Sequence, residues 1–418
     1  MQANARVSDV IMAVMAVVVL LGVLVDHPSL IALGATVAVL SLIGRVWVRW
    51  SLFDIETEYR TTYSRVFEGE SFELSLTVEN RKALTVPWIG ITEFVPKGLT
   101  VHETGGETRP HLNGTNIVSA TALGPHQSIT MCHRLYAARR GRYRFTPTHL
   151  RSGDLFAFYT NDRTIDVPQP DFTVYPKIVP LPALRLPSAQ PLGDATSRVW
   201  GVDDAMRPNG LREYRSGEPA RHIDWKATAR RGEPFVRLFD RTVTQSVVLI
   251  AECDIRRAAL SGARGPFLER TVVAAASVAV DCAQRGYQTG LICNGVPRGE
   301  RVRPYIPPGR GSSQLPVVLE TLAVAGSATT QDMPGLIERI GAKSIPFGAT
   351  VVCVTANFDP PTEAILRALQ SRGNPTVTLF VGPGATPRAA RLDIRDFRPL
   401  LTAAVTLEED PAREALNA

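Results

Sequence analysis

Two long apolar runs near the N-terminus constrain this chain more than any other feature. Val10–Val25 contains no charged or strongly polar residue, and Leu30–Ile43 is almost as apolar. Each run is shorter than the roughly 20 residues that a membrane-spanning helix needs, but flanking residues can extend both. The short polar segment Asp26–Ser29 separates them as a tight turn. The pattern predicts a transmembrane helical hairpin over residues 1–50.

Basic residues flank the outer ends of the two apolar runs. Arg6 precedes the first run, and Arg45 and Arg49 follow the core of the second, whereas the turn carries only Asp26 and His27. Because basic loops stay in the cytoplasm, both ends of the hairpin are predicted there. A cleaved signal peptide would also begin with Arg6 and an apolar stretch, but a second apolar run follows at once. We therefore predict a two-helix, multi-pass protein of the cell membrane whose soluble domains are cytoplasmic.

The next part of the chain, residues 55–182, has the short alternating pattern of half-buried strands. Ser71–Val78 alternates polar and apolar side chains with the period of a pleated strand. Turn-forming glycine clusters separate the runs, and no stretch has helical periodicity. This predicts an antiparallel, immunoglobulin-like β-sandwich. The other expected strands are Trp88–Phe94, Asn116–Ala120, Ile129–Tyr136, Tyr143–Pro147 and Phe172–Tyr175.

The C-terminal part, residues 241–418, alternates buried-type strands with helices after a linker and an arginine-rich segment at 183–240. Such alternation predicts a doubly wound α/β domain with a parallel sheet. The expected strands are Val247–Glu252, Gln288–Cys293, Ala349–Thr355 and Thr376–Val381. The expected helices are Pro266–Arg285, a segment around Leu315–Leu322, Pro334–Ile340 and Pro361–Arg372.

Composition and missing motifs argue against several classes of function. The chain of 418 residues has a net charge of +6 and only 7% aromatic residues, without the interleaved basic and aromatic residues of a nucleic-acid platform. Its five cysteines include no CxxC pair, which disfavours zinc and disulfide frameworks. The phosphate-binding loop, the dinucleotide fingerprint, the nucleophile elbow and HExxH are all missing from the sequence. We expect a non-enzymatic protein without a cofactor.

The densest functional pattern lies in the arginine-rich segment Gly210–Arg237. Pro219 and Gly232 predict the two ends of one short helix. On that helix Arg221 would lie one turn before Asp224 and Trp225, close enough to pair with the first and stack on the second. The candidate residues are Arg212, Tyr214, Arg215, Gly217, Arg221, Asp224, Trp225, Lys226 and Arg230.

Three interpretations of this segment stay open. In the first, the segment is an ion-paired clamp with Ile223 and Trp225 packed between domains, since charge networks are more often structural than catalytic. In the second, it is a basic docking surface for an acidic partner. Or His222 and Asp224 act as acid and base in a cell-envelope hydrolase or transferase, although no third catalytic partner is evident.

The stretch Arg212–Arg230 resembles the signature of the DUF58 family of bacterial membrane-anchored proteins. Arg139–Phe145, Ser152–Phe158 and Val174–Leu181 resemble segments that precede this signature. The resemblance implies a pair of membrane helices, a β-sandwich and a C-terminal von Willebrand factor A-like domain. It also implies an adaptor role beside a MoxR-type AAA+ ATPase in assembly or envelope-stress processes, with other von Willebrand A-like membrane proteins as possible partners.

Domains of the von Willebrand A type often bind a divalent cation through Asp-x-Ser-x-Ser after the first strand. Here that position holds Glu252, Asp254 and Arg256, so both serine hydroxyls are missing and an arginine is present. Hard cations need several oxygen ligands, and we therefore expect no metal at this degenerate site. Loops that follow parallel strands line one edge of the sheet, where a partner can still bind. These loops are Glu252–Arg257, Asn294–Gly295, Asn357–Asp359 and Gly382–Gly384.

Overall fold

The chain divides into two compact units. One comprises Met1–Ile178 with Leu322–Val324, and the other Val179–Thr321 with Ala325–Ala418. The computed structural model describes residues 14, 16–25, 27–145, 148–154, 159–165, 172–181, 184, 186–187, 208–215, 223–239, 245–254, 264–295, 303–329, 331–341, 344–383 and 385–405.

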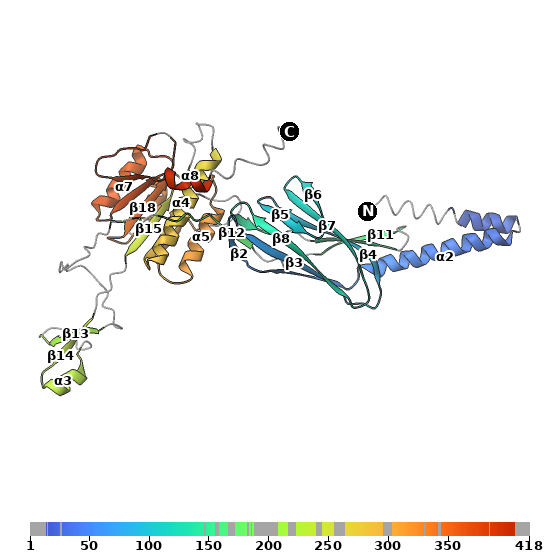
Figure 1. The fold of residues 1–418 in the computed structure, drawn as a ribbon, viewed down its shortest axis with the longest axis horizontal. Coiled ribbons are helices and arrows are strands. Elements are labelled where there is room, and N and C mark those ends of the chain that lie inside the picture. Colours follow the sequence, from blue (N-terminus) through green and yellow to red (C-terminus); the bar gives the residue numbers. More distant parts are fainter. Residues whose placement is uncertain are drawn as a thin grey trace. The chain divides into compact units, whose positions relative to one another are not determined.

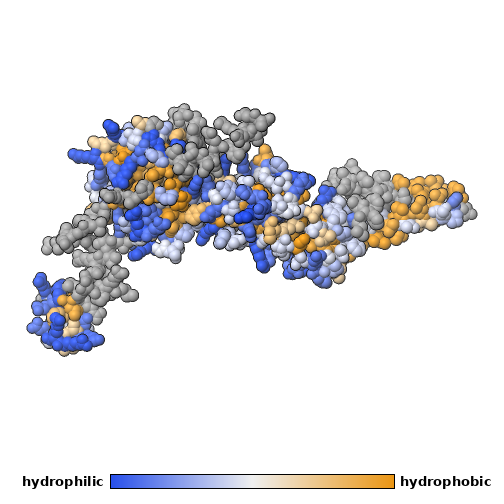
Figure 2. Space-filling view, in the orientation of Figure 1, coloured by the Kyte–Doolittle hydropathy of each residue, from blue (hydrophilic) through white to orange (hydrophobic). Residues whose placement is uncertain are grey.

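An apolar helix, α2 (Pro28–Ser51), precedes the strands of the first unit. Proline suits its first turn because an N–H at that position has no partner inside the helix. Among the described residues, α2 is the one helix long and apolar enough to cross a membrane, and Figure 2 shows a strongly hydrophobic surface there. Residues 16–24 are also helical and fold back so that Gly22 lies against Ile31 (Figure 1). Part of the first apolar run lies outside the described residues, so a second spanning helix stays a prediction.

Two antiparallel sheets and a small third sheet follow α2. The four-stranded sheet has the order β1-β3-β8-β5, the five-stranded sheet β11-β10-β4-β7-β6, and the small sheet β2-β12-β9. The strands are β1 (Ile55–Thr61), β2 (Arg65–Phe67), β3 (Ser71–Asn80), β4 (Val86–Pro96), β5 (Leu99–Thr104), β6 (Glu107–His111), β7 (Gly114–Leu123), β8 (Ser128–Ala137), β9 (Gly141–Tyr143), β10 (Thr148–Gly153), β11 (Thr160–Ile165) and β12 (Phe172–Tyr175).

The core of this unit lies between the two larger sheets. Leu76 of β3, Ile91 of β4 and Leu150 of β10 belong to one apolar cluster, and a second cluster surrounds the stacked rings of Phe72 and Phe172. The expected antiparallel sheets are confirmed. The strand expected at Tyr143–Pro147 is wrong in position, because β9 ends at Tyr143.

A six-stranded sheet of order β17-β16-β15-β18-β19-β20 organises the second unit. All neighbouring strands are parallel except β17, which pairs antiparallel with β16. Central strands of such a sheet are buried on both faces and read as continuous apolar runs. The strands are β15 (Ser246–Ala251), β16 (Gln288–Cys293), β17 (Tyr305–Gly309), β18 (Thr350–Thr355), β19 (Thr376–Phe380) and β20 (Asp393–Asp396).

Helices cover both faces of this sheet. Leu336 of α6 and Leu366 of α7 pack on the face that carries Val248 and Ile250. Because strand side chains alternate between faces, Val247 and Leu249 of β15 point to the opposite face. Helix α4 contacts β15, β16 and β18 and covers that face. The expected alternation of strands and helices is confirmed. The helices are α4 (Arg264–Gln284), α5 (Gln314–Val324), α6 (Met333–Ile340), α7 (Pro360–Ser371) and α8 (Arg398–Val405).

Candidate functional site

The sheet of the second unit gathers polar side chains where its central strands end. β15 lies between β16 and β18, so the chain leaves these three neighbours at one edge. The Asn294 Oδ1 atom accepts a hydrogen bond from the Cys253 backbone N–H at 2.7 Å, and Asn357 Nδ2 donates to the Asp254 carbonyl at 2.6 Å. Open α/β sheets bind ligands at such edges, where the connections diverge to opposite faces. Parts of three of the predicted loops, at Glu252–Asp254, Asn294 and Asn357, therefore meet here, whereas residues 255–257 and Gly384 lie outside the described residues.

Glu252 is the most unusual group at this edge. Its side chain is buried, and its Oε2 lies 2.5 Å from the Thr355 hydroxyl oxygen, which lies equally close to the Asn357 carbonyl oxygen. A hydroxyl carries one proton, and a carbonyl oxygen carries none. Both short contacts are hydrogen bonds only if Glu252 is protonated and donates to Thr355, which then donates to the carbonyl.

The electrostatic surroundings agree with a neutral Glu252. Burial raises the pKa of the Glu252 carboxyl to about 8, and the charges of Asp359, Asp254 and Asp332 act in the same direction, whereas the contact with Thr355 lowers it. Burial disfavours the charged form of any carboxyl, and nearby negative charge adds to the effect. These surroundings favour the protonated, neutral form of Glu252 at neutral pH.

The donor set at this edge does not fit a divalent cation. Among the described residues, no group of three or more His, Cys, Asp and Glu side chains could hold a metal ion. The Glu252 carboxyl is engaged with Thr355, and Asp359 accepts a hydrogen bond from Thr362 N–H as the N-cap of α7. The cation that the sequence resemblance implies thus lacks suitable ligands here. Arg256 lies outside the described residues.

The arginine-rich segment forms a small β-hairpin with one helix. β13 (Pro208–Glu213) pairs antiparallel with β14 (Phe235–Phe239), and α3 (Trp225–Arg231) lies between them in sequence. Asp224 caps α3 by accepting hydrogen bonds from the backbone N–H groups of Lys226 and Ala227. Such a cap satisfies N–H groups that have no partner in the helix.

One end of the predicted helix needs correction. The helix begins at Trp225 with Asp224 as its N-cap, and not near Pro219, because the aspartate supplies the capping carboxylate. Its predicted end is confirmed, since Gly232 adopts a left-handed conformation with φ of 80°. The expected contacts of Gly217, Arg221 and His222 lie outside the described residues.

Several side chains of α3 are exposed. Trp225 is 68% exposed, and Lys226 and Arg230 are exposed beside it. The packing of Ile223 and Trp225 between domains stays a prediction. Arg231 lies over the ring of Phe235, 5.0 Å from its centre. In β13, Arg212 donates to the Glu213 carbonyl; just after the strand, Tyr214 N–H donates to the Pro234 carbonyl and Arg215 is exposed. The segment thus presents a large aromatic ring among basic groups.

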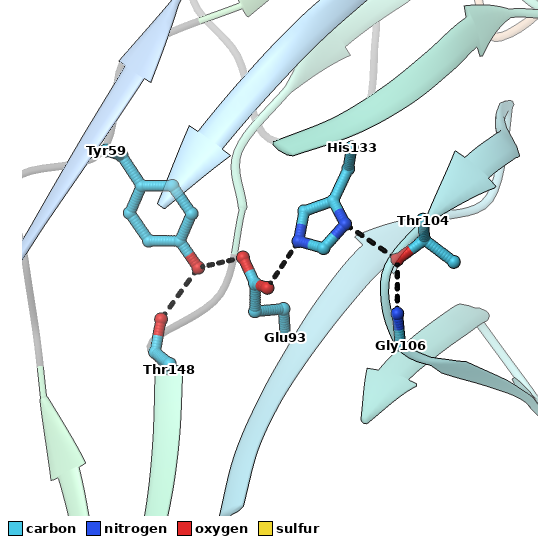
Figure 3. Close-up of polar contacts among 6 residues, drawn as sticks. All are labelled: Tyr59, Glu93, Thr104, Gly106, His133 and Thr148. Atoms are coloured by element: carbon cyan, nitrogen blue, oxygen red, sulfur yellow. Dashed lines mark hydrogen bonds and ion pairs between the residues drawn. The ribbon is translucent and has the colours of Figure 1, made fainter. Parts of the chain in front are cut away.

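A third polar group lies inside the β-sandwich, and the sequence analysis did not find it. Glu93 accepts hydrogen bonds from Tyr59 at 3.0 Å and from His133 Nε2 at 2.7 Å (Figure 3). The other ring nitrogen of His133 lies 2.7 Å from the Thr104 hydroxyl, and Tyr59 also contacts Thr148. Burial and then the Glu93 charge raise the pKa of Tyr59 above its usual value, so its hydroxyl stays protonated.

This buried group has a structural role. Tyr59, Thr104 and His133 belong to one sheet, whereas Glu93 and Thr148 belong to the other. One arrangement of protons satisfies all of these side-chain hydrogen bonds: Thr148 donates to Tyr59, and Tyr59 and His133 donate to Glu93. Thr104, which accepts from Gly106 N–H, donates to His133. Fully paired buried groups of this kind fix how two surfaces align.

A comparison with protein families gives a match over part of the chain. Residues 210–382 are similar to the family model described as "Protein of unknown function DUF58". A comparison with curated proteins gives no match.

Several solved structures are similar to part of the chain. A cohesin module from a Clostridium perfringens family 33 glycoside hydrolase is 11% identical, covers 29% of this chain and 96% of its own, and has a TM-score of 0.22. Domains D2 and D3 of the major pilin SpaD from Corynebacterium diphtheriae are 5% identical, with coverages of 27% and 50% and a TM-score of 0.21. A Nocardia farcinica protein with an immunoglobulin-like fold is 9% identical, with coverages of 28% and 96% and a TM-score of 0.20.

Proposed function

We propose that this DUF58 protein is a membrane-anchored, non-enzymatic adaptor that binds a protein partner through α3 and the strands beside it. The observation that carries the proposal is the exposed ring of Trp225 next to Lys226 and Arg230, within the matched family segment. Tryptophan and arginine dominate the energetics of protein interfaces, and a basic rim speeds association with an acidic partner.

The partner that we propose is an AAA+ ATPase of the MoxR type, with an acidic surface facing α3. The resemblance of the signature Arg212–Arg230 to the DUF58 family supports this choice. Within the same proposal, the six-stranded sheet is a von Willebrand A-like domain. A mostly parallel sheet with one antiparallel edge strand, β17, and helices on both faces supports that assignment.

Membrane attachment is the second part of the proposal. A hairpin formed by residues 10–48 would anchor the protein in the cell membrane, and the basic residues Arg6, Arg45 and Arg49 favour a cytoplasmic position for both units. The length and hydropathy of α2 support the anchor.

A catalytic role has less support. Asp224, one of the two residues that a hydrolase would use, accepts two backbone hydrogen bonds as the cap of α3. A capping carboxylate has an adequate structural reason to be there, so it does not point to acid–base chemistry.

Capture of the ATPase from solution tests the adaptor role. Full-length protein in detergent should retain a purified MoxR-type ATPase, and Trp225→Ala together with Lys226→Glu and Arg230→Glu should reduce the affinity at least tenfold. Arg339→Glu with Arg372→Glu makes the matched charge change at two exposed positions of α6 and the end of α7 and should retain binding. Equal capture by the α3 variant, with unchanged circular dichroism, would reject α3 as the docking surface.

A further inference from the structure

The contacts of α2 limit how much of it can lie freely in lipid. The Ser41 hydroxyl lies 2.7 Å from the Tyr159 hydroxyl, and the Val48 carbonyl accepts a hydrogen bond from Asn161 at 3.3 Å. Beyond the helix end, the Leu52 carbonyl accepts a hydrogen bond from Arg163 at 2.7 Å. From Ser41 onward, one side of the helix is therefore covered by the region of β10 and β11.

The part of α2 that precedes these contacts is too short to cross a bilayer. Pro28–Leu40 contains 13 residues, which rise about 20 Å at 1.5 Å per residue. The hydrocarbon core of a bilayer is about 30 Å thick. The missing length has to come from the part of α2 that also contacts the sandwich.

The other side of that part is suited to lipid. Five large apolar side chains are exposed there, which we call the outer α2 face: Leu42, Ile43, Val46, Trp50 and Phe53. Successive helical residues turn by about 100°, which places the four in α2 on one arc, roughly opposite the buried Ser41, Gly44, Val48 and Ser51. Arg49 is exposed at the edge of this arc, and Arg45 is exposed at the border between the two sides of the helix.

We propose that the outer α2 face is embedded in the hydrocarbon and headgroup boundary of an anionic bilayer. This inference rests on the proposed membrane anchor. The face continues the apolar surface of the same helix, and Trp50 and the two arginines are residue types that anchor helices at the interface. The lipid then covers one side of α2 while the β-sandwich covers the other. The sandwich therefore sits directly on the membrane surface.

Spin-label accessibility measures this depth. The full chain carries Cys132→Ser, because Cys132 is the one exposed cysteine, and is reconstituted in phosphatidylcholine vesicles that contain phosphatidylglycerol. Single labels are placed at Val46→Cys and Phe53→Cys. A label at Leu33→Cys reports the span itself, and one at Tyr63→Cys reports the aqueous side of the sandwich; both sites are exposed in the protein.

Lipid contact should make the Val46 and Phe53 labels accessible to oxygen and inaccessible to an aqueous nickel complex, as at Leu33. Tyr63 should show the reverse. If the nickel complex reaches the labels at Val46 and Phe53 but not the label at Leu33, this inference is overturned and the anchor stays intact. Nickel access at Leu33 as well would overturn the anchor. Labels shielded from both reagents would mean that protein covers this face, which also contradicts the proposal.

The role of anionic lipid has a separate test. Arg45→Gln with Arg49→Gln should shift the Phe53 label toward the aqueous phase in the anionic vesicles and change little in pure phosphatidylcholine. An equal response in both lipids would remove the charge component of the proposal.

Discussion

The two units each bury a carboxyl group, but the surroundings of the two groups favour opposite charge states. In the sandwich, Glu93 accepts hydrogen bonds from Tyr59 and His133. In the α/β unit, Glu252 has the hydroxyl of Thr355 and is surrounded by further acidic residues. A paired buried carboxylate aligns two surfaces, whereas a carboxyl that burial forces to stay protonated costs stability at neutral pH. By this comparison, the buried carboxyl at the Glu252 sheet edge lowers the folding stability at neutral pH, whereas the polar group in the sandwich does not.

Removal of the histidine should have the largest effect. His133→Ala leaves Glu93 buried without one of its two hydrogen-bond donors, and an unsatisfied buried charged group costs about 3 kcal/mol or more. Hydrogen exchange of the β8 amides in the full protein should show this loss of stability. A loss below about 1 kcal/mol would mean that the pair does not hold the sheets together.

Neutral Glu252 predicts a pH dependence. Its folded pKa of about 8 lies above 4.5, the ordinary value for a glutamate, so the stability that it contributes is complete below pH 4.5 and is lost as the pH rises through 8. Glu252→Gln preserves the neutral shape and should remove this dependence. At pH 8.5 the variant should be more stable than the original protein by on the order of 3 kcal/mol. Thermal unfolding at pH 5 and pH 8.5 tests this, and parallel pH profiles would contradict it.

The hydroxyl of Thr355 should matter less than the charge state of Glu252. Thr355→Val leaves the Glu252 proton and the Asn357 N–H without their acceptor, which costs about 1–3 kcal/mol. Thr376 provides a matched control, because its hydroxyl is buried without a hydrogen-bond partner and Thr376→Val should not destabilise the protein. Chemical unfolding compares the two, and equal losses would show that hydrogen bonding is not the cause.

The smallest effect is expected for Tyr59→Phe. The variant keeps the ring and the His133 partner of Glu93 but removes the phenolic donor, at a cost of about 1 kcal/mol. Hydrogen exchange of the β4 amides should detect it. A loss as large as that of His133→Ala would make Tyr59 the main partner of Glu93.

Much of the fold could be predicted from the sequence because its signals are local. The buried strands of the second unit are continuous apolar runs, and β3 alternates along its length. Strands without such a pattern were missed: all five residues of β6 are exposed, and β11 has no buried residue. Their pairing depends on neighbouring strands and not on burial of their own side chains.

The candidate site could be predicted less well. Glu252, Asn294 and Asn357 were expected at one edge because each follows a strand, but nothing local marks Thr355 as the partner of Glu252. The start of α3 was misplaced because a proline signal was preferred to the capping aspartate Asp224. The pair of Glu93 and His133 joins residues 40 positions apart, and no spacing rule reveals it.

The hydrogen bonds from Asn161 and Arg163 to the carbonyls of Val48 and Leu52 have a mechanical consequence. They brace the helix against a strand, so the two cannot pivot about a loose hinge. A bilayer that thickens or thins changes the tilt of a helix embedded in it, and this brace would turn the sandwich by the same angle. In the proposed anchor, a change in membrane thickness would therefore change the orientation of the sandwich.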